Sequence, residues 1–191
     1  MNESEYKYML TIEQYDKILN HLKSKYKMNT IIQVNYYLDT NTFELDEKDI
    51  TLRIRQKKDS LRLDLKSPVL RDGALRVKNE FTRSISELPL TIKFENDEWN
   101  DFISCKSDMY LKGMLITERT IFIFNEGIEI DLDLNYYLGV MDYELEVEFQ
   151  EEFQADAVEL INSLARHGEL KPSEFGKRSR FFKKLKEKMS I

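Results

Sequence analysis

Apolar and polar residues alternate with a period of two along most of the chain, a pattern that predicts β-strands. Two of these segments are separated only by Lys58-Asp59, which predicts a hairpin, and Asn125-Glu126-Gly127 predicts a tight turn between two others. The pattern predicts eight strands of ordinary length, at residues 3–10, 30–39, 50–57, 60–66, 75–84, 116–124, 127–134 and 142–150.

The three-four spacing of apolar residues that is typical of an amphipathic helix occurs in fewer segments. Thr11-Ile12-Glu13-Gln14 has the form of a capping box and predicts a helix that runs to about Tyr26. Further helices are predicted at residues 97–105, 152–167 and 173–189. Without an internal repeat or a clear linker, the chain is expected to form a single α+β domain over residues 1–191.

Composition excludes several classes of protein. The net charge of −6, from 29 Lys and Arg against 35 Asp and Glu, argues against a nucleic-acid partner. No G-x-x-x-x-G-K-[ST] or G-x-G-x-x-G motif occurs, which excludes P-loop and Rossmann phosphate sites. Cys105 is the only cysteine and histidine occurs twice, so a metal would be held mainly by carboxylates, which favours Mg²⁺ or Mn²⁺.

The same composition bears on location. The lone cysteine cannot form an intrachain disulfide, which fits a reducing compartment. The first residues do not resemble a signal peptide, and no stretch approaches the roughly 20 apolar residues of a membrane span. We therefore expect a cytoplasmic protein without a membrane partner, whose oligomeric state the sequence leaves open.

Nearly every predicted strand has one charged face and one apolar face, because successive side chains point to opposite sides of a strand. One interpretation is a sheet with a solvated outer face. However, the charges are segregated by strand, since cations lie along residues 53–66 and carboxylates along residues 129–148. The alternative is a closed antiparallel eight-stranded barrel with a charged interior and a few helices outside it. Such an interior must be a water-filled tunnel with a ligand, because unpaired buried charges are costly.

The two sets of charges suggest a ligand. Arginine matches phosphate oxygens in a bidentate manner, so a row of Arg and Lys suits a polyanion. Clustered carboxylates would repel that polyanion unless divalent cations bridged them. Cations, carboxylates and a metal together are the usual requirement of phosphoryl transfer. A linear polyphosphate or a nucleoside triphosphate is therefore the expected substrate.

An ordered set of motifs resembles the CYTH superfamily, also called triphosphate tunnel metalloenzymes. The chain begins with an E-x-E-x-K motif, Glu3-Ser4-Glu5-Tyr6-Lys7, and the resemblance extends over roughly residues 3–182. It is closest to the small single-domain firmicute-type members. The later motifs are Tyr36-Tyr37-Leu38-Asp39-Thr40, Leu52-Arg53-Ile54-Arg55, Leu63-Asp64-Leu65-Lys66, Glu80 with Arg83, Glu118-Arg119, Asp131 with Asp133, Tyr136-Tyr137-Leu138-Gly139, Glu144-Leu145-Glu146-Val147-Glu148 and Lys177-Arg178-Ser179-Arg180-Phe181.

The resemblance implies a role for individual residues. Mg²⁺ or Mn²⁺ would be held by Glu3, Glu5, Asp133, Glu144 and Glu146, of which Glu5, Glu144 and Glu146 would be catalytic. Phosphate oxygens would be bound by Lys7, Arg53, Arg55, Lys66, Arg119 and Lys177. Glu80 would pair with a basic neighbour and orient it, and Glu148 shares the face of the metal ligands. Asp131 and Asp133 compete for one position, and strand parity does not separate them.

The leading interpretation is metal-dependent hydrolysis of a triphosphate, above all inorganic tripolyphosphate, to diphosphate and orthophosphate. Two alternatives use the same residues, namely a class IV adenylyl cyclase that converts ATP to cyclic AMP, and a thiamine triphosphatase. A third alternative is a polyphosphate- or nucleotide-binding module without turnover. The presence of both acidic motifs weighs against that module, because binding a polyanion needs only the cations.

Overall fold

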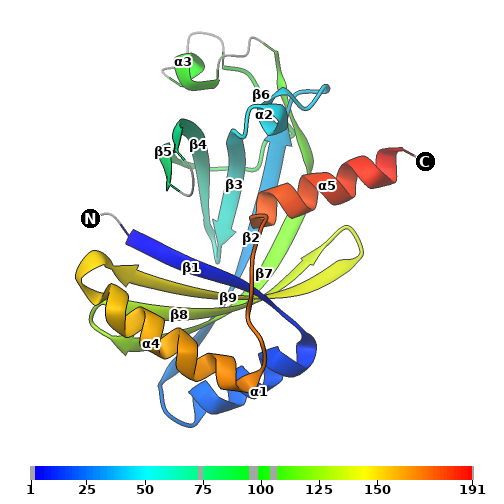
Figure 1. Ribbon diagram of the computed structural model, residues 1–191. Helices are drawn as coiled ribbons and strands as arrows, with labels where there is room; N and C mark the ends of the chain where they lie inside the picture. The colour runs from blue at the N-terminus through cyan, green and yellow to red at the C-terminus, as the bar shows by residue number, and fades with distance from the viewer. Residues whose placement is uncertain (1–2, 73–74, 95–98, 104–106, 191) are drawn as a thin grey trace. The chain divides into compact units, whose positions relative to one another are not determined.

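The computed structural model describes residues 3–72, 75–94, 99–103 and 107–190 (Figure 1). The strands are β1 (Glu3–Leu10), β2 (Met28–Asp39), β3 (Thr51–Lys57), β4 (Ser60–Asp72), β5 (Leu75–Ile85), β6 (Thr91–Ile92), β7 (Met109–Asn125), β8 (Ile128–Tyr137), β9 (Val140–Gln150) and β10 (Lys171–Pro172). The helices are α1 (Ile12–Lys23), α2 (Glu44–Glu47), α3 (Asn100–Ile103), α4 (Gln154–Leu164) and α5 (Lys177–Met189), with 3₁₀ turns η1 (Glu151–Phe153) and η2 (Ala165–His167). Helices separate β1 from β2 and β2 from β3, whereas in the described residues β3–β6 and β7–β9 follow one another without a helix between them.

The strands form one sheet in the order β10-β1-β9-β8-β7-β2-β3-β4-β5, and β6 pairs with β7. Within the described residues this order ends at β10 on one side and at β5 on the other, and no pairing joins the two ends. Among the described residues the sheet has ten strands and no pairing that closes it, so the predicted closed barrel of eight strands is contradicted in both respects. Alternation predicts which residues share a face, whereas closure depends on whether two distant edge strands meet, and alternation carries no information on that.

Most predicted strands lie within a few residues of the observed ones, and both predicted turns are present. Lys58 adopts a positive φ of 50° in the β3–β4 turn. The Asn125 side chain accepts a hydrogen bond from the Gly127 N–H at 2.8 Å in the β7–β8 turn. The sequence pattern missed the two-residue strands β6 and β10, the first half of β7 and the short helix α2. The predicted helix at residues 97–105 falls partly outside the described residues, and α3 lies within its predicted range. Cys105 lies outside the described residues.

The described part of the chain divides into two compact units. The first unit contains residues 1–32 and 116–176, and the second contains residues 33–115 and 177–191. The boundaries fall inside β2 and β7, so each of these strands contributes to both units. The expectation of a single domain over residues 1–191 stays a prediction. None of the described helices has the length and apolar character that crossing a membrane requires.

In the first unit, α1 and α4 cover the apolar face of the strands (Figure 1). The predicted capping box starts α1: the Thr11 hydroxyl accepts from the Gln14 N–H at 3.2 Å, and the Gln14 side chain accepts from the Thr11 N–H at 2.8 Å. The buried core of this unit contains Tyr15, Ile18 and Leu22 of α1, Leu160 and Leu164 of α4, and Phe122, Ile130, Leu132, Leu145 and Val147 of β7–β9. The opposite face of these strands carries the charged residues.

The second unit has a separate apolar core on one face of β2–β5. Leu38, Leu52, Ile54, Leu63 and Leu65 form its centre, and Leu45, Trp99, Ile103 and Met109 pack against them. On the polar side of these strands, α5 buries Phe181 against Tyr37, with ring centroids 5.0 Å apart. The helix begins at Lys177, four residues later than the pattern predicts. The two cores thus leave one polar face on the strands of each unit.

Candidate metal centre and phosphate-binding residues

The polar face of the first unit is built from cross-strand rows of charged residues on β1, β7, β8 and β9. In an antiparallel sheet, each residue of one strand lies directly opposite a residue of the adjacent strand. The rows are Lys7–Glu146–Asp131, Glu5–Glu148–Glu129 and Glu144–Asp133–Arg119. Opposite-face neighbours such as Leu145 and Leu132 are fully buried in the apolar core. Strand alternation alone therefore places all of these charges on one face.

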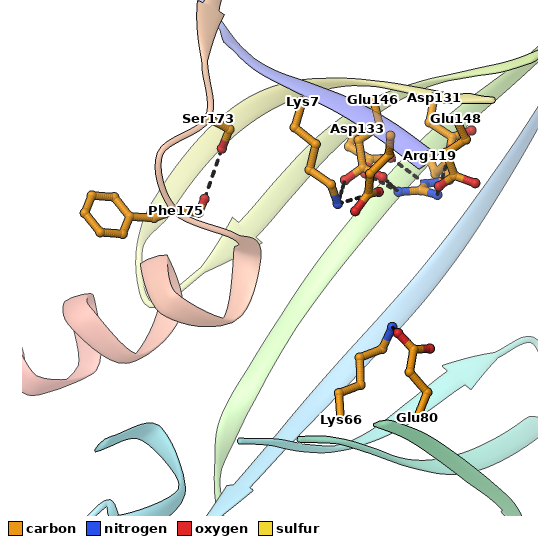
Figure 2. Close-up of polar contacts among 11 residues, drawn as sticks. Lys7, Lys66, Glu80, Arg119, Asp131, Asp133, Glu146, Glu148, Ser173 and Phe175 are labelled. Atoms are coloured by element: carbon orange, nitrogen blue, oxygen red, sulfur yellow. Dashed lines mark hydrogen bonds and ion pairs between the residues drawn. The ribbon is translucent and has the colours of Figure 1, made fainter. Parts of the chain in front are cut away.

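Arg119 lies at the centre of this face and contacts carboxylates from two neighbouring strands (Figure 2). Its guanidinium donates to Asp133 from Nε at 2.8 Å and from Nη2 at 2.6 Å, and Nη2 also donates to Glu146 at 2.8 Å. Nη1 forms ion pairs with Asp131 and, at 3.8 Å, with Glu148. Burial by itself lowers the pKa of Arg119, but the hydrogen bond to Asp133 and the surrounding carboxylates outweigh it and raise that pKa.

Lys7 supplies the second cation of the face. Its Nζ forms an ion pair with Glu146 at 3.2 Å (Figure 2) and another with Glu5 at 2.9 Å. The Glu146 carboxylate is 3% exposed, and it accepts from both Lys7 and Arg119. Its orientation is thus fixed from two sides. Glu5, in contrast, is half-exposed at 47%.

Asp131 is the most unusual carboxylate of the group. It is fully buried, and neither of its oxygens has a hydrogen-bond partner among the described residues, although Arg119 lies close enough to form an ion pair. Burial, together with the charges of Asp133 and Glu129, raises its pKa to about 8 against the attraction of Arg119. Burial and the charge of Glu146 likewise raise the pKa of Glu148. The face therefore holds more negative charge than its two cations neutralise.

This surplus fits a divalent cation. Carboxylate oxygens lie within 4.8 Å of one another in three groups, which are Asp133 with Glu144 and Glu146, Glu5 with Glu146 and Glu148, and Glu129 with Asp131 and Glu148. All members of the first group are buried. An all-oxygen set, beside which the buried Asp131 carboxylate lacks a hydrogen-bond partner among the described residues, suits Mg²⁺ or Mn²⁺ rather than a softer metal.

The second unit carries cations on its polar face. Arg53 and Arg55 alternate along β3, and Lys66 follows on β4. The Nζ of Lys66 donates to Glu80 of β5 at 2.6 Å (Figure 2), which confirms that Glu80 pairs with a basic neighbour. Arg53 Nε donates to the buried carboxylate of Asp64 at 3.1 Å, and Arg55 Nε donates to the Asn35 side chain at 3.2 Å.

Lys177 acts electrostatically on the same buried phenol, that of Tyr37, as Arg53 and Arg55 do. Burial raises the pKa of the fully buried Tyr37 phenol, and four positive charges oppose that rise: Arg53, Lys177, Arg55 and Arg178. Lys177 is the first residue of α5, and Arg178 beside it donates to Asp49 at 2.6 Å and to the Ile50 carbonyl at 3.1 Å. The start of α5 is thus tied to the loop before β3, in the same unit as Arg53 and Arg55.

The structure brings the predicted site residues together in two sets. Glu5, Lys7, Arg119, Asp133, Glu144 and Glu146 lie on the polar face of the first unit, and Arg53, Arg55, Lys66 and Lys177 belong to the second. The side chain of Glu3 is outside the described part of the structure. That the two sets line one channel stays a prediction. Sequence reasoning gave no role to Asp64 or Arg62, although alternation had placed both on the cationic face.

Fold and site together define the class: an α+β protein with a mainly antiparallel sheet, a carboxylate group suited to a divalent cation, and a second group of cations suited to a polyanion. Residues 1–182 match the model of the CYTH domain, so the chain belongs to the CYTH domain family. The resemblance inferred from the ordered motifs is thereby confirmed.

Known relatives agree with this assignment. YjbK of Bacillus subtilis (strain 168), named as a candidate triphosphatase, is 32% identical over 149 residues, which are 76% of each chain. A solved structure from Bacillus halodurans, named as a candidate adenylate cyclase, is 25% identical with a TM-score of 0.68 and covers 95% of this chain and 100% of its own. HpAC1 from Hippeastrum, described as having a dominant triphosphatase activity, shares the fold with a TM-score of 0.73 at 22% identity, over 96% of each chain.

Proposed function

We propose that this protein hydrolyses a triphosphate with the help of Mg²⁺ or Mn²⁺, and that inorganic tripolyphosphate is its main substrate. The products would be diphosphate and orthophosphate. The observation that carries the proposal is the buried group of Asp133, Glu144 and Glu146 next to Arg119 on one polar face. Family membership and the names of YjbK and HpAC1 support the same activity.

The carboxylates of the first unit would hold the metal. Asp133, Glu144 and Glu146 are the buried set, Glu5 lies in a second group with Glu146, and Glu3 is assigned by the motif alone. When bound, the cation would neutralise negative charge on the phosphate oxygens. Asp133 is preferred to Asp131 as a ligand because its oxygens group with those of Glu144 and Glu146, whereas those of Asp131 group with Glu129 and Glu148.

The protein groups would perform the remaining tasks. Lys7 and Arg119 can donate to phosphate oxygens while they hold Glu146 in place. A carboxylate of β9, Glu144 or Glu146, would accept a hydrogen bond from the attacking water and orient it toward the terminal phosphorus. Arg53, Arg55, Lys66 and Lys177 of the second unit would bind phosphate oxygens and stabilise the charge that develops on the leaving diphosphate. No serine, cysteine or histidine nucleophile is required.

A substrate panel tests the activity. Purified protein would be incubated with tripolyphosphate, ATP and thiamine triphosphate, each with Mg²⁺, with Mn²⁺ and with EDTA. Orthophosphate, diphosphate and cyclic AMP would be measured. We expect tripolyphosphate to give equal amounts of orthophosphate and diphosphate, and EDTA to stop the reaction. Orthophosphate release that continues undiminished in EDTA would contradict the metal assignment.

Matched variants test the site. Glu146→Gln removes one carboxylate charge from the buried group, and we expect activity to fall about 100-fold or more. Glu126→Gln makes the same change at an exposed position in the β7–β8 turn and should leave the activity intact. Equal background release by the wild type and Glu146→Gln would favour a polyphosphate-binding module without turnover.

A second candidate activity is adenylyl cyclisation, because the Bacillus halodurans relative bears the name of an adenylate cyclase. In that reaction the ribose 3′-hydroxyl would attack the α-phosphorus of ATP and diphosphate would leave. The product separates the two reactions. Cyclic AMP with diphosphate and without orthophosphate would replace the triphosphatase proposal.

A further inference from the structure

Three arginines surround one buried carboxylate on the polar face of the second unit. We infer that Asp64 positions Arg53, Arg55 and Arg62 as a single phosphate-binding group, in which Arg62 is a further substrate-binding residue. This inference rests on the proposed function, because it assigns Arg62 and Asp64 to the binding of the same triphosphate. Arg53 and Arg55 already have that role, whereas Arg62 and Asp64 have none so far.

The geometry centres on Asp64, whose carboxylate is 4% exposed. Arg53 Nε donates to its Oδ2 at 3.1 Å, and Arg62 Nε donates to its Oδ1 at 2.8 Å. Arg55 Nε lies 4.0 Å from Oδ2, and the Thr82 hydroxyl donates to Oδ1 at 3.1 Å. The carboxylate thus accepts from three strands, β3, β4 and β5. Arg53 and Arg62 both approach it through Nε, whereas the Nε of Arg55 donates to the Asn35 side chain at 3.2 Å.

Approach through Nε leaves the outer nitrogens of each arginine available. In the described part of the chain, every side-chain hydrogen bond of Arg53, Arg55 and Arg62 uses Nε and none uses an Nη nitrogen. Each pair of Nη groups carries four N–H donors. A phosphate group presents acceptors that match this fork. Asp64 would therefore fix the orientation of Arg53 and Arg62, and attract Arg55 beside them, without using the donors that a phosphate needs.

The register of the strands shows an excess of positive charge. Arg55 of β3 lies directly opposite Arg62 of β4, and like charges at opposed positions destabilise a sheet. One carboxylate among three arginines leaves two positive charges without a neutralising partner in the group. Burial, followed by the repulsion of Arg53 and Arg62, lowers the pKa of Arg55 to about 10 despite the attraction of Asp64. An anionic ligand would relieve this repulsion.

A purely structural role is the alternative interpretation. Arg62 is 46% exposed, so it could be a surface cation whose only purpose is to pair with Asp64. The two interpretations differ in what they expect for ligand binding. A structural pair affects stability alone, whereas a phosphate-binding group affects the affinity for tripolyphosphate as well.

The first test removes the donors of Arg62. The dissociation constant of tripolyphosphate would be measured by calorimetry in EDTA, and KM and kcat for tripolyphosphate in Mg²⁺. We expect Arg62→Gln to weaken binding and raise KM about tenfold, with a smaller change in kcat. Lys58→Gln removes one positive charge from the exposed turn of the same hairpin and serves as the control. Equal affinities for Arg62→Gln and Lys58→Gln would overturn the inference.

The second test separates positioning from charge. Asp64→Asn keeps the shape of the side chain but removes a negative charge, so charge alone predicts tighter binding of an anion. Positioning predicts the opposite, about tenfold weaker binding, because the amide nitrogen of asparagine cannot accept from an arginine. Asp59→Asn makes the same change of charge at an exposed site in the same hairpin. An Asp64→Asn variant that is folded and binds at least as tightly as Asp59→Asn would refute the positioning role.

The two proposals fail in different ways. If the wild type binds tripolyphosphate without hydrolysing it, and Arg62→Gln weakens that binding, the arginine group is supported and the triphosphatase proposal fails. If the wild type hydrolyses tripolyphosphate and Arg62→Gln changes neither affinity nor KM, the triphosphatase proposal is supported and the arginine group fails. Thermal unfolding of each variant checks its fold. Should Asp64→Asn not fold, Arg62→Lys is the variant to measure, because lysine keeps the positive charge but lacks the planar pair of guanidinium donors. Full retention of tripolyphosphate affinity by Arg62→Lys would overturn the inference.

Discussion

Replacing Arg119 by methionine should destabilise the first unit strongly. The change removes the guanidinium that contacts Asp131, Asp133 and Glu146, whose side chains are at most 3% exposed. Removing one partner of a buried ion pair typically costs about 3–5 kcal/mol, because the remaining charge stays buried without compensation. Asp133 and Glu146 lose the hydrogen bonds that Arg119 donates, so we expect a loss within that range. Methionine occupies similar space, so the loss would reflect charge rather than a cavity.

Unfolding in urea, followed by circular dichroism in EDTA at neutral pH, measures this loss. Arg166→Met is the matched control, because Arg166 is exposed on η2, and we expect its change in the free energy of unfolding to be within about 0.5 kcal/mol. Mg²⁺ or Mn²⁺ at about 100 times its dissociation constant stabilises a folded protein by about 2.7 kcal/mol, and this linkage should partly restore Arg119→Met. A loss below about 1 kcal/mol in EDTA would refute the argument that Arg119 neutralises buried charge.

Three further predictions concern residues away from the site's centre. A Cβ on Gly127 would overlap the Phe153 ring, so Gly127→Ala should cost about 1–3 kcal/mol in urea unfolding, whereas Gly176→Ala, with nothing within 4 Å, should cost far less. Burial and nearby positive charges lower the pKa of His21, so the unfolded state takes up its proton first and stability should fall as the pH drops below about 6.5; a pH titration of the melting temperature that is identical for His21→Gln would contradict this. Asp39 accepts three backbone N–H groups, so Asp39→Asn turns an amide donor toward one of them and should lower stability by about 1–3 kcal/mol; an unchanged melting temperature would count against it.

Much of the fold could be predicted from local patterns. The capping box at Thr11 and the turn at Asn125 are present because each depends on residues within three positions of one another. The short strands β6 and β10 could not be predicted, because two residues are too few to show a period. The lack of a pairing between β10 and β5 in the described residues was also beyond the sequence pattern, since these edge strands are far apart in the chain.

The candidate site likewise has features that alternation predicted and features that only strand register decided. Alternation placed Asp131 and Asp133 on one face but could not distinguish them. The register with β9 does distinguish them, because Asp133 lies opposite Glu144 and Asp131 opposite Glu146. Alternation also placed Arg62 and Asp64 on the cationic face. That Asp64 accepts from Arg53 across the strands depends on the β3–β4 register, which brings residues 11 positions apart into contact.

By itself, the sequence determined which side chains share a face, where helices begin, and which family's ordered motifs the chain carries. These properties follow from periodicity and short spacings, and a linear sequence displays both directly. Only the tertiary structure decided which charges pair, which buried carboxylate lacks a hydrogen bond among the described residues, and which strands lie next to one another. Those outcomes depend on strand register and on burial. The groups that neutralise a buried charge are distant from it in sequence, and they come into contact with it only when the strands assemble.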